Sequence, residues 1–291
     1  MTAAEWDGPT FEAHRPLLFS IAYRMLGSAT EAEDVVQDAW IRARQDEHAD
    51  IRSPRAYLTT IVTRLCIDHL RSAERTRLRY PGPRLPEPLA EPIQEPAELA
   101  CSLTTAFLVM LEHLAPIERA VFLLREVFER DFDEIARSVG KSEANTRQIL
   151  TRVRGRLRES RPRFAASRAE SEEIVERFRH ACVTGNVDAL MAVLHADATF
   201  VADGGCNAPV PSTRLLGAER IAQFLIDIGG PVRWLESDPQ VVTINGAPGL
   251  LLRHPMSGNA TCSFDIAGGR IRAIYVVRDP KKLRRFLEQT H

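Results

Sequence analysis

The 291-residue chain lacks three features that would assign it to familiar classes of protein. Its five cysteines are scattered, odd in number and without a CxxC pair. Neither a disulfide framework nor a zinc site is therefore supported. No apolar run approaches the length of a membrane span, and the N-terminus MTAAEWDGPT has no charged-then-apolar signal pattern. We expect a cytoplasmic protein without a metal or cofactor. Its thiols should be reduced and mostly buried: Cys66, Cys101, Cys182, Cys206 and Cys262.

The charge of the chain is balanced overall but unevenly distributed. The net charge is −1, yet between Lys141 and Arg163 eight basic residues stand against two acidic ones, Glu143 and Glu159. Such a run suits contacts to phosphates, although charge runs are more often a solvated helix face. The 44% hydrophobic content provides enough apolar material for two to three compact domains.

The segment FDEIARSVGKSEANTRQILTRVRGRLR has the spacing of a helix-turn-helix. Ala136 is small where two helices must approach closely, and Gly140 follows four residues later, where the turn needs positive φ. Asp131 and Glu134 predict a capping box for the first helix, and Ser142 predicts the N-cap of the second. Three apolar residues should form the shared core: Ile135, Val139 and Ile149.

The second helix of this motif is predicted to bind DNA. Its N-terminal end enters the major groove in such motifs, so its polar side chains can read base edges. These side chains are Ser142, Glu143, Asn145, Thr146, Arg147 and Gln148. The following arginines suit phosphate contacts, which position a protein without reading sequence: Arg152, Arg154, Arg156, Arg158, Arg161 and Arg163.

The N-terminal part of the chain, from about Phe11 to Arg79, is predicted to be helical throughout. Gly27 and Ser28 should end the first helix, and Thr30 with Glu33 predicts a capping box for the second. A polar loop at about 45–53 then precedes Pro54, which suits the start of a third helix. That helix finishes in a basic series: Arg71, Arg75, Arg77 and Arg79.

A proline-rich linker joins these two helical blocks. Residues 81–96 contain six prolines, so the segment should be extended and not helical. At roughly 3.1 Å per residue, such a spacer can separate two DNA-reading units by tens of ångströms. A bland tether is the simpler alternative.

The two helical blocks resemble regions 2 and 4 of an extracytoplasmic-function (ECF) sigma factor. The resemblance implies that the chain binds core RNA polymerase, through its clamp helices and flap, together with the −10 and −35 elements of promoter DNA. EDVVQDAW looks like region 2.2, which implies that Asp34, Gln37 and Trp40 bind the clamp helices. Packing in the core is an equally good interpretation for Trp40.

By the same resemblance, the loop at 45–52 and the following helix would melt the −10 element and capture a flipped base. The sequence departs from the family at Arg64, where many members carry asparagine. Three arginines after it are interpreted as phosphate contacts: Arg71, Arg75 and Arg77.

A third unit follows Arg163. The helix SEEIVERFRHACVTGN should stop at Gly185 and Asn186, Asp188 should cap a short helix, and DIAGGRIRAIYVV reads as a hairpin. Helices followed by a meandering sheet resemble the SnoaL-like, or NTF2-like, α+β cone. The expected fold is therefore two all-α sigma domains plus this cone, with region 2 at 1–80, the linker at 81–98, region 4 at 99–163 and the cone at 164–291.

Three short motifs are similar to those of sigma factors with a C-terminal SnoaL-like extension, the sigma-J-like group. That group typically has WLPEP in the linker and DGGGK and NPDKL in the extension, and this chain carries a degraded version of each in the expected order. The matching segments are Arg84-Leu85-Pro86-Glu87-Pro88, Asp203-Gly204-Gly205-Cys206-Asn207 and Asp279-Pro280-Lys281-Lys282-Leu283.

In that group the extension regulates the sigma factor in cis, and weak contacts suffice because a fused domain has a high effective concentration. We hypothesise that Asp203, Gly204 and Gly205 form a tight turn that touches the linker near Leu85 to Pro88.

Other functions stay open at this point. The fold also hosts enzymes and ligand-binding pockets, and candidate pocket residues are His195, Asp197, Asp203 and Tyr275. A ligand sensor without turnover, or a weakly catalytic cone, would use the same residues. A dimeric helix-turn-helix repressor would bind duplex DNA without polymerase, but a repressor needs no second helical block with an arginine-rich end.

Overall fold

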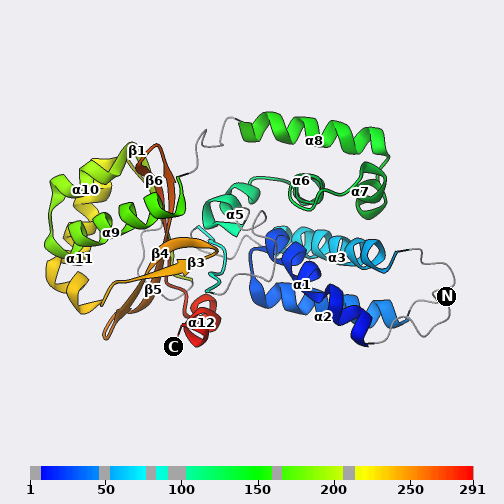
Figure 1. Ribbon diagram of the computed structural model, residues 1–291, viewed down its shortest axis with the longest axis horizontal. Helices are drawn as coiled ribbons and strands as arrows, with labels where there is room; N and C mark the ends of the chain where they lie inside the picture. The colour runs from blue at the N-terminus through cyan, green and yellow to red at the C-terminus, as the bar shows by residue number, and fades with distance from the viewer. Residues whose placement is uncertain are drawn as a thin grey trace. The chain divides into compact units, whose positions relative to one another are not determined.

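The computed structural model describes residues 8–45, 53–76, 83–90, 103–158, 166–205 and 214–290 (Figure 1). Contacts divide the chain into two compact units. The first comprises Met1–Arg79, Ile93–Ser102 and Met110–Arg161, and the second comprises Tyr80–Pro92, Leu103–Val109 and Pro162–His291. The described residues of the linker, 83–90, therefore belong to the same compact unit as the C-terminal part of the chain.

The first unit begins with three long helices that pack on one another: α1 (Gly8–Leu26), α2 (Ala29–Gln45) and α3 (Pro54–Thr76). Helix α1 ends where Gly27 takes a φ of 72°. Helix α2 buries one stripe of small and branched residues, which lets its neighbours approach closely: Ala29, Ala32, Val35, Val36, Ala39 and Ala43.

The start of α2 differs from the prediction. Ser28 is its cap, because the Ser28 hydroxyl accepts a hydrogen bond from the Glu31 N–H at 3.2 Å. The predicted capping box of Thr30 and Glu33 is wrong, since the left-handed Gly27 turns the chain early enough for the helix to begin at Ala29. The Glu33 carboxylate instead pairs with Arg15 at 2.9 Å.

The second part of the first unit contains the helix-turn-helix. It is formed by α6 (Pro116–Glu126), α7 (Phe132–Val139) and α8 (Glu143–Arg158). The helix before them, α5 (Thr105–Leu111), begins in the second unit. Gly140 closes α7 with a φ of 65°, and Ser142 caps α8 by accepting the Asn145 N–H at 3.2 Å, as predicted. The predicted shared core is confirmed, because its three members are buried: Ile135, Val139 and Ile149.

The predicted capping box at the start of α7 is wrong. Asp131 occupies the N-cap position, but its side chain makes no capping hydrogen bond. Its carboxylate lies 3.7 Å from Arg125, and Glu134 lies 4.0 Å from Arg130. Both acids are therefore directed toward arginines and away from the backbone N–H groups of the helix.

The second unit is an α+β domain built on a six-stranded sheet of order β2-β1-β6-β5-β4-β3. Neighbouring strands are antiparallel except β1 and β6, which are parallel. The strands are β1 (Leu194–Asp203), β2 (Leu215–Leu216), β3 (Gln240–Ile244), β4 (Ala247–His254), β5 (Gly258–Ala267) and β6 (Arg270–Val277). The predicted hairpin is confirmed as β5–β6.

Three helices cover one face of this sheet and a fourth lies against the other face (Figure 1). They are α9 (Arg168–Thr184), α10 (Val187–Val193), α11 (Ala218–Glu236) and α12 (Pro280–Gln289). Gly185 ends α9 as predicted. The cap of α10 is Asn186, whose side chain accepts the Ala189 N–H at 2.9 Å, so Asp188 lies inside the helix and the predicted cap is wrong.

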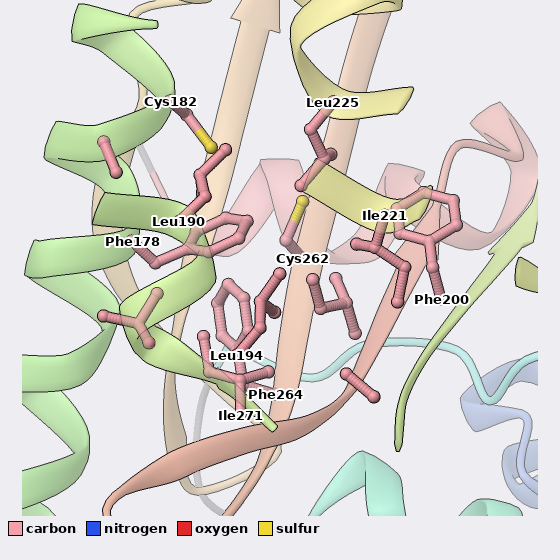
Figure 2. Close-up of a cluster of buried hydrophobic side chains, with 14 of the residues drawn as sticks. Phe178, Cys182, Leu190, Leu194, Phe200, Ile221, Leu225, Cys262, Phe264 and Ile271 are labelled. Carbon is pink, nitrogen blue, oxygen red and sulfur yellow. The ribbon is translucent and has the colours of Figure 1, made fainter. Parts of the chain in front are cut away.

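The inner face of the sheet is packed with apolar side chains from all these layers (Figure 2). Phe178 is central, with ring centroids 5.1 Å from Phe264 and 6.3 Å from Trp234. Phe200 meets Phe224 at 5.1 Å. The sequence order of helices and then strands thus yields an α+β domain, as expected, with aromatic edge contacts in its interior.

The outer face of the sheet is covered by the linker and α12. Leu85 of the linker packs with Val201 of β1 and with Tyr275 and Val277 of β6, and Leu283 of α12 joins them. Alternation along the strands separates these residues from the inner core, because successive side chains point to opposite faces. An apolar face that would otherwise meet solvent is therefore covered by the chain itself.

Among the described residues, no helix combines the length and apolar character needed to cross a bilayer. In the same part of the chain, no three His, Cys, Asp or Glu side chains gather in a way that could hold a metal ion.

The described cysteines are buried thiols. Cys66, Cys182 and Cys262 are free and buried, whereas Cys101 and Cys206 lie outside the described residues. Burial raises the pKa of all three thiols, that of Cys262 to about 12. These groups are therefore protonated and shielded at neutral pH.

We expect slow thiol labelling in a Cys101→Ser/Cys206→Ser variant. The three remaining cysteines should react with Ellman's reagent at least about 100-fold more slowly in the native chain than in denaturant, because burial suppresses both access and thiolate formation. Mass spectrometry assigns each modified site. Rapid native labelling of any one of the three would contradict the packing described here.

Candidate functional site

The exposed face of α8 carries most of the predicted DNA-reading side chains. The helix buries Ile149, Leu150, Val153 and Leu157 against the rest of the helix-turn-helix. The opposite side is exposed, and it includes Ser142, Glu143, Asn145, Arg147, Gln148, Arg152 and Arg154. A polar face of this kind can enter a groove without disturbing the core.

Thr146 is the exception among the predicted readers. It is 0% exposed, and its hydroxyl donates to the Ser142 carbonyl at 3.0 Å. Position 146 falls on the buried side of α8, because it lies three residues before Ile149, one helical turn away. Thr146 therefore has a structural role, and its prediction as a base reader is corrected.

Several of the α8 arginines make ion pairs within the chain. Arg147 lies 3.1 Å from Glu143 and over the Phe132 ring at 4.5 Å, and Arg154 lies 2.6 Å from Glu126. Arg156 pairs with Glu118 at 2.6 Å. Exposed pairs contribute little, about 0–1 kcal/mol, so phosphates can replace these carboxylates. The side chains of Arg158, Arg161 and Arg163 lie outside the described residues.

Helix α2 carries the residues predicted to bind polymerase. Asp34 and Gln37 are exposed, and Ile41 continues the same stripe while leaving 46% of its surface in solvent. Trp40 is half-buried, with its ring 4.8 Å from Phe11. The sequence analysis did not predict that Ile41 is exposed on this face. An isolated isoleucine in a helical pattern is usually interpreted as a core residue.

The predicted −10 region is described only in part. Residues 46–52 and Arg77 lie outside the described residues, as does the side chain of Arg75. Arg71 is exposed on α3, 3.9 Å from Asp68. Arg64 points to the helix-turn-helix, where its Nη2 donates to the Arg137 carbonyl at 2.7 Å.

The three degraded motifs of the sequence meet at one buried carboxylate, that of Asp203. Its Oδ2 accepts the backbone N–H of Leu85 at 2.8 Å and lies 2.7 Å from the Lys282 ammonium. Its Oδ1 accepts the Gly205 N–H at 3.0 Å. Lys282 also donates to the Leu85 carbonyl, so the side chains of Asp203 and Lys282 together satisfy both backbone groups of Leu85.

The parallel pairing of β1 and β6 explains why these motifs converge. Asp203 pairs with Val277, so the two strands end at the same edge of the sheet. Asp279 follows β6 and caps α12 by accepting the Lys281 N–H at 2.9 Å. Gly205 has a φ of +67°, and a Cβ on it would meet the Asp279 carboxylate at 2.6 Å, so the turn requires glycine.

A second contact to the linker involves Asn245, which the sequence reasoning missed. Its side-chain Oδ1 accepts the Leu89 N–H at 2.8 Å, and its backbone N–H donates to the Leu89 carbonyl at 2.8 Å. Its Nδ2 donates to Thr105 Oγ1 at the start of α5, at 3.1 Å. The available signal was the Asn-Gly pair at 245–246, which is typical of a tight hairpin turn with positive φ.

The linker residues between these two contacts are buried. Leu85, Pro86, Glu87, Pro88 and Leu89 all have low exposure, and Glu87 is 3% exposed. The segment is free of helix, as its proline content predicts. Residues 85–89 are therefore packed within the C-terminal unit, with Leu85 against the outer face of the sheet.

The candidate catalytic residues do not converge. His195 and Asp203 occupy opposite ends of β1, about 26 Å apart at roughly 3.3 Å per residue. The Asp203 carboxylate is occupied by Lys282 and Leu85. Burial raises the pKa of Tyr275 to about 12, so its hydroxyl stays protonated near neutral pH. His195 accepts the Asp197 N–H at 3.2 Å, a local turn contact.

Comparisons with known protein families identify the two helical regions of the chain. Residues 10–76 match the family model Sigma-70 region 2, and residues 104–157 match Sigma-70, region 4. The match to both regions disfavours the repressor alternative, because a repressor needs no polymerase-binding region.

Two curated relatives from Mycobacterium tuberculosis are similar over nearly the whole chain. The ECF RNA polymerase sigma factor SigJ is 32% identical, covering 94% of this chain and 91% of its own length. The probable ECF RNA polymerase sigma factor SigI is 30% identical, covering 94% and 93%. The crystal structure of SigJ superposes with a TM-score of 0.76 over 96% of this chain and 98% of that one, at 30% identity. The chain thus belongs to the ECF RNA polymerase sigma factors.

Proposed function

We propose that this sigma factor, which binds core RNA polymerase and directs promoter-specific initiation, is regulated in cis by its C-terminal α+β domain. The observation that carries the proposal is the Asp203 site, where the domain binds the linker through both backbone groups of Leu85. The linker joins the two promoter-reading regions, so a domain that fixes the linker restricts how those regions can be placed.

The energetics favour a firm attachment. The Asp203 side chain is 0% exposed and that of Lys282 is 13% exposed, so water screens their interaction little. Removing one partner of such a buried pair costs about 3–5 kcal/mol, because the other charge is left uncompensated. The apolar contacts of Leu85 with the outer sheet face add to this attachment.

The remaining roles follow from the exposed faces. We propose that residues 1–80 bind the polymerase clamp helices through Asp34, Gln37 and Trp40, with Ile41 extending the contact, and read the −10 element. Residues 99–163 would read the −35 element and meet the flap, with base contacts from the exposed end of α8. Residues 81–98 would be the regulated linker, and 164–291 the regulatory cone.

The cone is proposed to act as a docking domain and not as an enzyme. Its inner face is packed with aromatic and aliphatic side chains, and its candidate catalytic groups lie far apart or are occupied. A small ligand in the cone would have to displace that packing. The protein would act in the cytoplasm, where bacterial RNA polymerase works.

Loss of the Asp203 carboxylate should release the linker. In run-off transcription with core RNA polymerase on a promoter selected by sequencing bound DNA, the full-length Asp203→Asn chain should change its output toward that of a chain ending at Ser167. The physical reason is that Leu85 loses a charged acceptor and Lys282 loses its counter-ion.

Asp197→Asn provides the matched control, because Asp197 is an exposed aspartate on the same strand. Its output should equal that of the unmodified chain. If the truncated and full-length chains initiate equally, the domain does not regulate initiation. Initiation by neither chain would count against the assignment of the reading regions.

Asn245 should hold the linker independently of Asp203. Asn245→Gly keeps the positive φ of 50° but removes the amide, so the Leu89 N–H should exchange with deuterium about tenfold faster, as expected for the loss of about 1.4 kcal/mol. Asn245→Asp keeps an acceptor for that N–H and should keep its protection. Equal exchange in both variants would show that the side chain does not hold the linker.

Substitutions on the exposed face of α8 should distinguish contacts to bases from contacts to phosphates. In holoenzyme promoter binding, Gln148→Ala should cost about 1–3 kcal/mol on the preferred −35 sequence and less on altered ones. Arg152→Ala should weaken all sequences alike and reduce the salt slope by about one. Arg168→Ala, an exposed arginine on α9, serves as the control. Identical sequence profiles for all three variants would refute the proposed base contact.

A further inference from the structure

The first residue of α7 is a phenylalanine that remains only half-buried. Phe128, four residues earlier, is 8% exposed and belongs to the core, whereas the ring of Phe132 is in contact with charged side chains. The guanidinium of Arg147 in α8 lies over this ring, 4.5 Å from its centroid, and that of Arg125 in α6 lies over it at 5.0 Å. Cations are attracted to the face of an aromatic ring. Phe132 therefore supports an arginine from each of the two neighbouring helices.

Among the described arginines of α8, Arg147 alone lies over an aromatic ring. The others are exposed in the C-terminal half of the helix: Arg152, Arg154 and Arg156. A phosphate contact needs a positive charge near the DNA backbone, but it carries no sequence information. A bidentate base contact needs a fixed guanidinium plane, because two donors must meet two acceptors at once. The ring thus supports the one described arginine in the half of α8 that enters the groove in this motif.

A carboxylate restricts the same guanidinium from another direction. Glu143, one helical turn earlier, lies 3.1 Å from Nη2 of Arg147. The two side chains are 47% and 55% exposed, so the ion pair alone holds them weakly. With a ring against its face and a carboxylate at one edge, the guanidinium has fewer orientations to lose on binding, and its remaining N–H donors stay available.

The free edge of Arg147 fits a guanine. Guanine presents two acceptors in the major groove, O6 and N7, and a bidentate arginine is the commonest specific contact to them. Adenine places an N–H₂ donor beside its N7, cytosine offers a donor, and thymine offers one acceptor beside a methyl group. None of these three edges satisfies two arginine donors. The preorganised fork therefore selects guanine.

We propose that Phe132 is a positioning residue for promoter recognition, and that Arg147, held by its ring, binds O6 and N7 of one guanine in the −35 element. This inference rests on the proposed reading of that element by α8. Phe132 touches no base and acts through Arg147. Arg125 contacts the ring from α6, and its Nη1 also donates to the Arg130 carbonyl at 2.8 Å, in the turn that leads to Phe132.

Promoter binding by the holoenzyme, the full chain with core RNA polymerase, tests the guanine contact. On a promoter selected by sequencing bound DNA, each guanine of the −35 element is replaced in turn by 7-deazaguanine, which lacks the N7 acceptor. The unmodified chain should lose at least about fivefold in affinity at one of these positions. Arg147→Ala should bind the original and the substituted promoter equally well. Arg154→Ala is the matched control: it should bind both more weakly and keep the discrimination between them.

The role of the ring is tested by two substitutions at position 132. Phe132→Leu keeps an apolar side chain but removes the ring face, so the discrimination should fall to about twofold or less. Its affinity for the 7-deazaguanine promoter should equal that of the unmodified chain. Phe132→Tyr keeps the ring and should keep the full discrimination. A merely structural role would weaken both promoters alike, because a displaced α8 would also lose its phosphate contacts.

Four outcomes would overturn the inference: discrimination that persists in Arg147→Ala, discrimination that persists in Phe132→Leu, equal weakening of both promoters by Phe132→Leu, or loss of discrimination in Phe132→Tyr. Failure of the proposed −35 reading is a different result. It would appear in the unmodified chain, as binding that no base change in the −35 element alters. A −35 preference that involves no guanine would leave the reading in place and overturn the assignment of Arg147.

Discussion

The C-terminal unit depends on the environment of one buried carboxylate. Asp203 has no exposed side-chain surface, and a charge in that position is tolerable only when its oxygens are fully engaged. Lys282 and the N–H groups of Leu85 and Gly205 provide that engagement, and each comes from a different segment of the chain. Satisfying the carboxylate therefore requires the linker, the turn after β1 and the start of α12 to come together. The position of the linker is, in this sense, part of the domain's own folding.

Local signals in the sequence predicted the helices and strands better than the residues at which helices begin or the strands that pair. The helix-turn-helix was predictable because Ala136 and Gly140 are constrained by contacts a few residues away, and the αL conformation of Gly140 agrees with that reasoning. Helix starts were less certain, because Ser28 and Thr30 both have suitable hydroxyls and the choice depended on where Gly27 turned the chain. The meeting of Asp203 and Asp279 depends on the parallel pairing of β1 and β6, which alternation along a strand does not encode.

Side chains that act at a distance were the hardest to assign. The Asn-Gly pair at 245–246 predicts a hairpin turn, yet nothing near it in the sequence indicates that Asn245 accepts from Leu89, 156 residues earlier. Arg64 was recognised only as a departure from the family pattern, and its partner carbonyls lie more than 70 residues away. In both cases the side chain satisfies an orphan backbone group, and such groups become apparent only when helix ends and turns are placed in space.

The contacts at Asp203 and the contact between α3 and α7 have different physical characters. At the Asp203 site every named donor and acceptor is matched, which suits a permanent attachment. The contact between α3 and α7 combines charge-assisted hydrogen bonds, each about 1.5–3 kcal/mol, with a hollow and with unpaired nitrogens on Arg130.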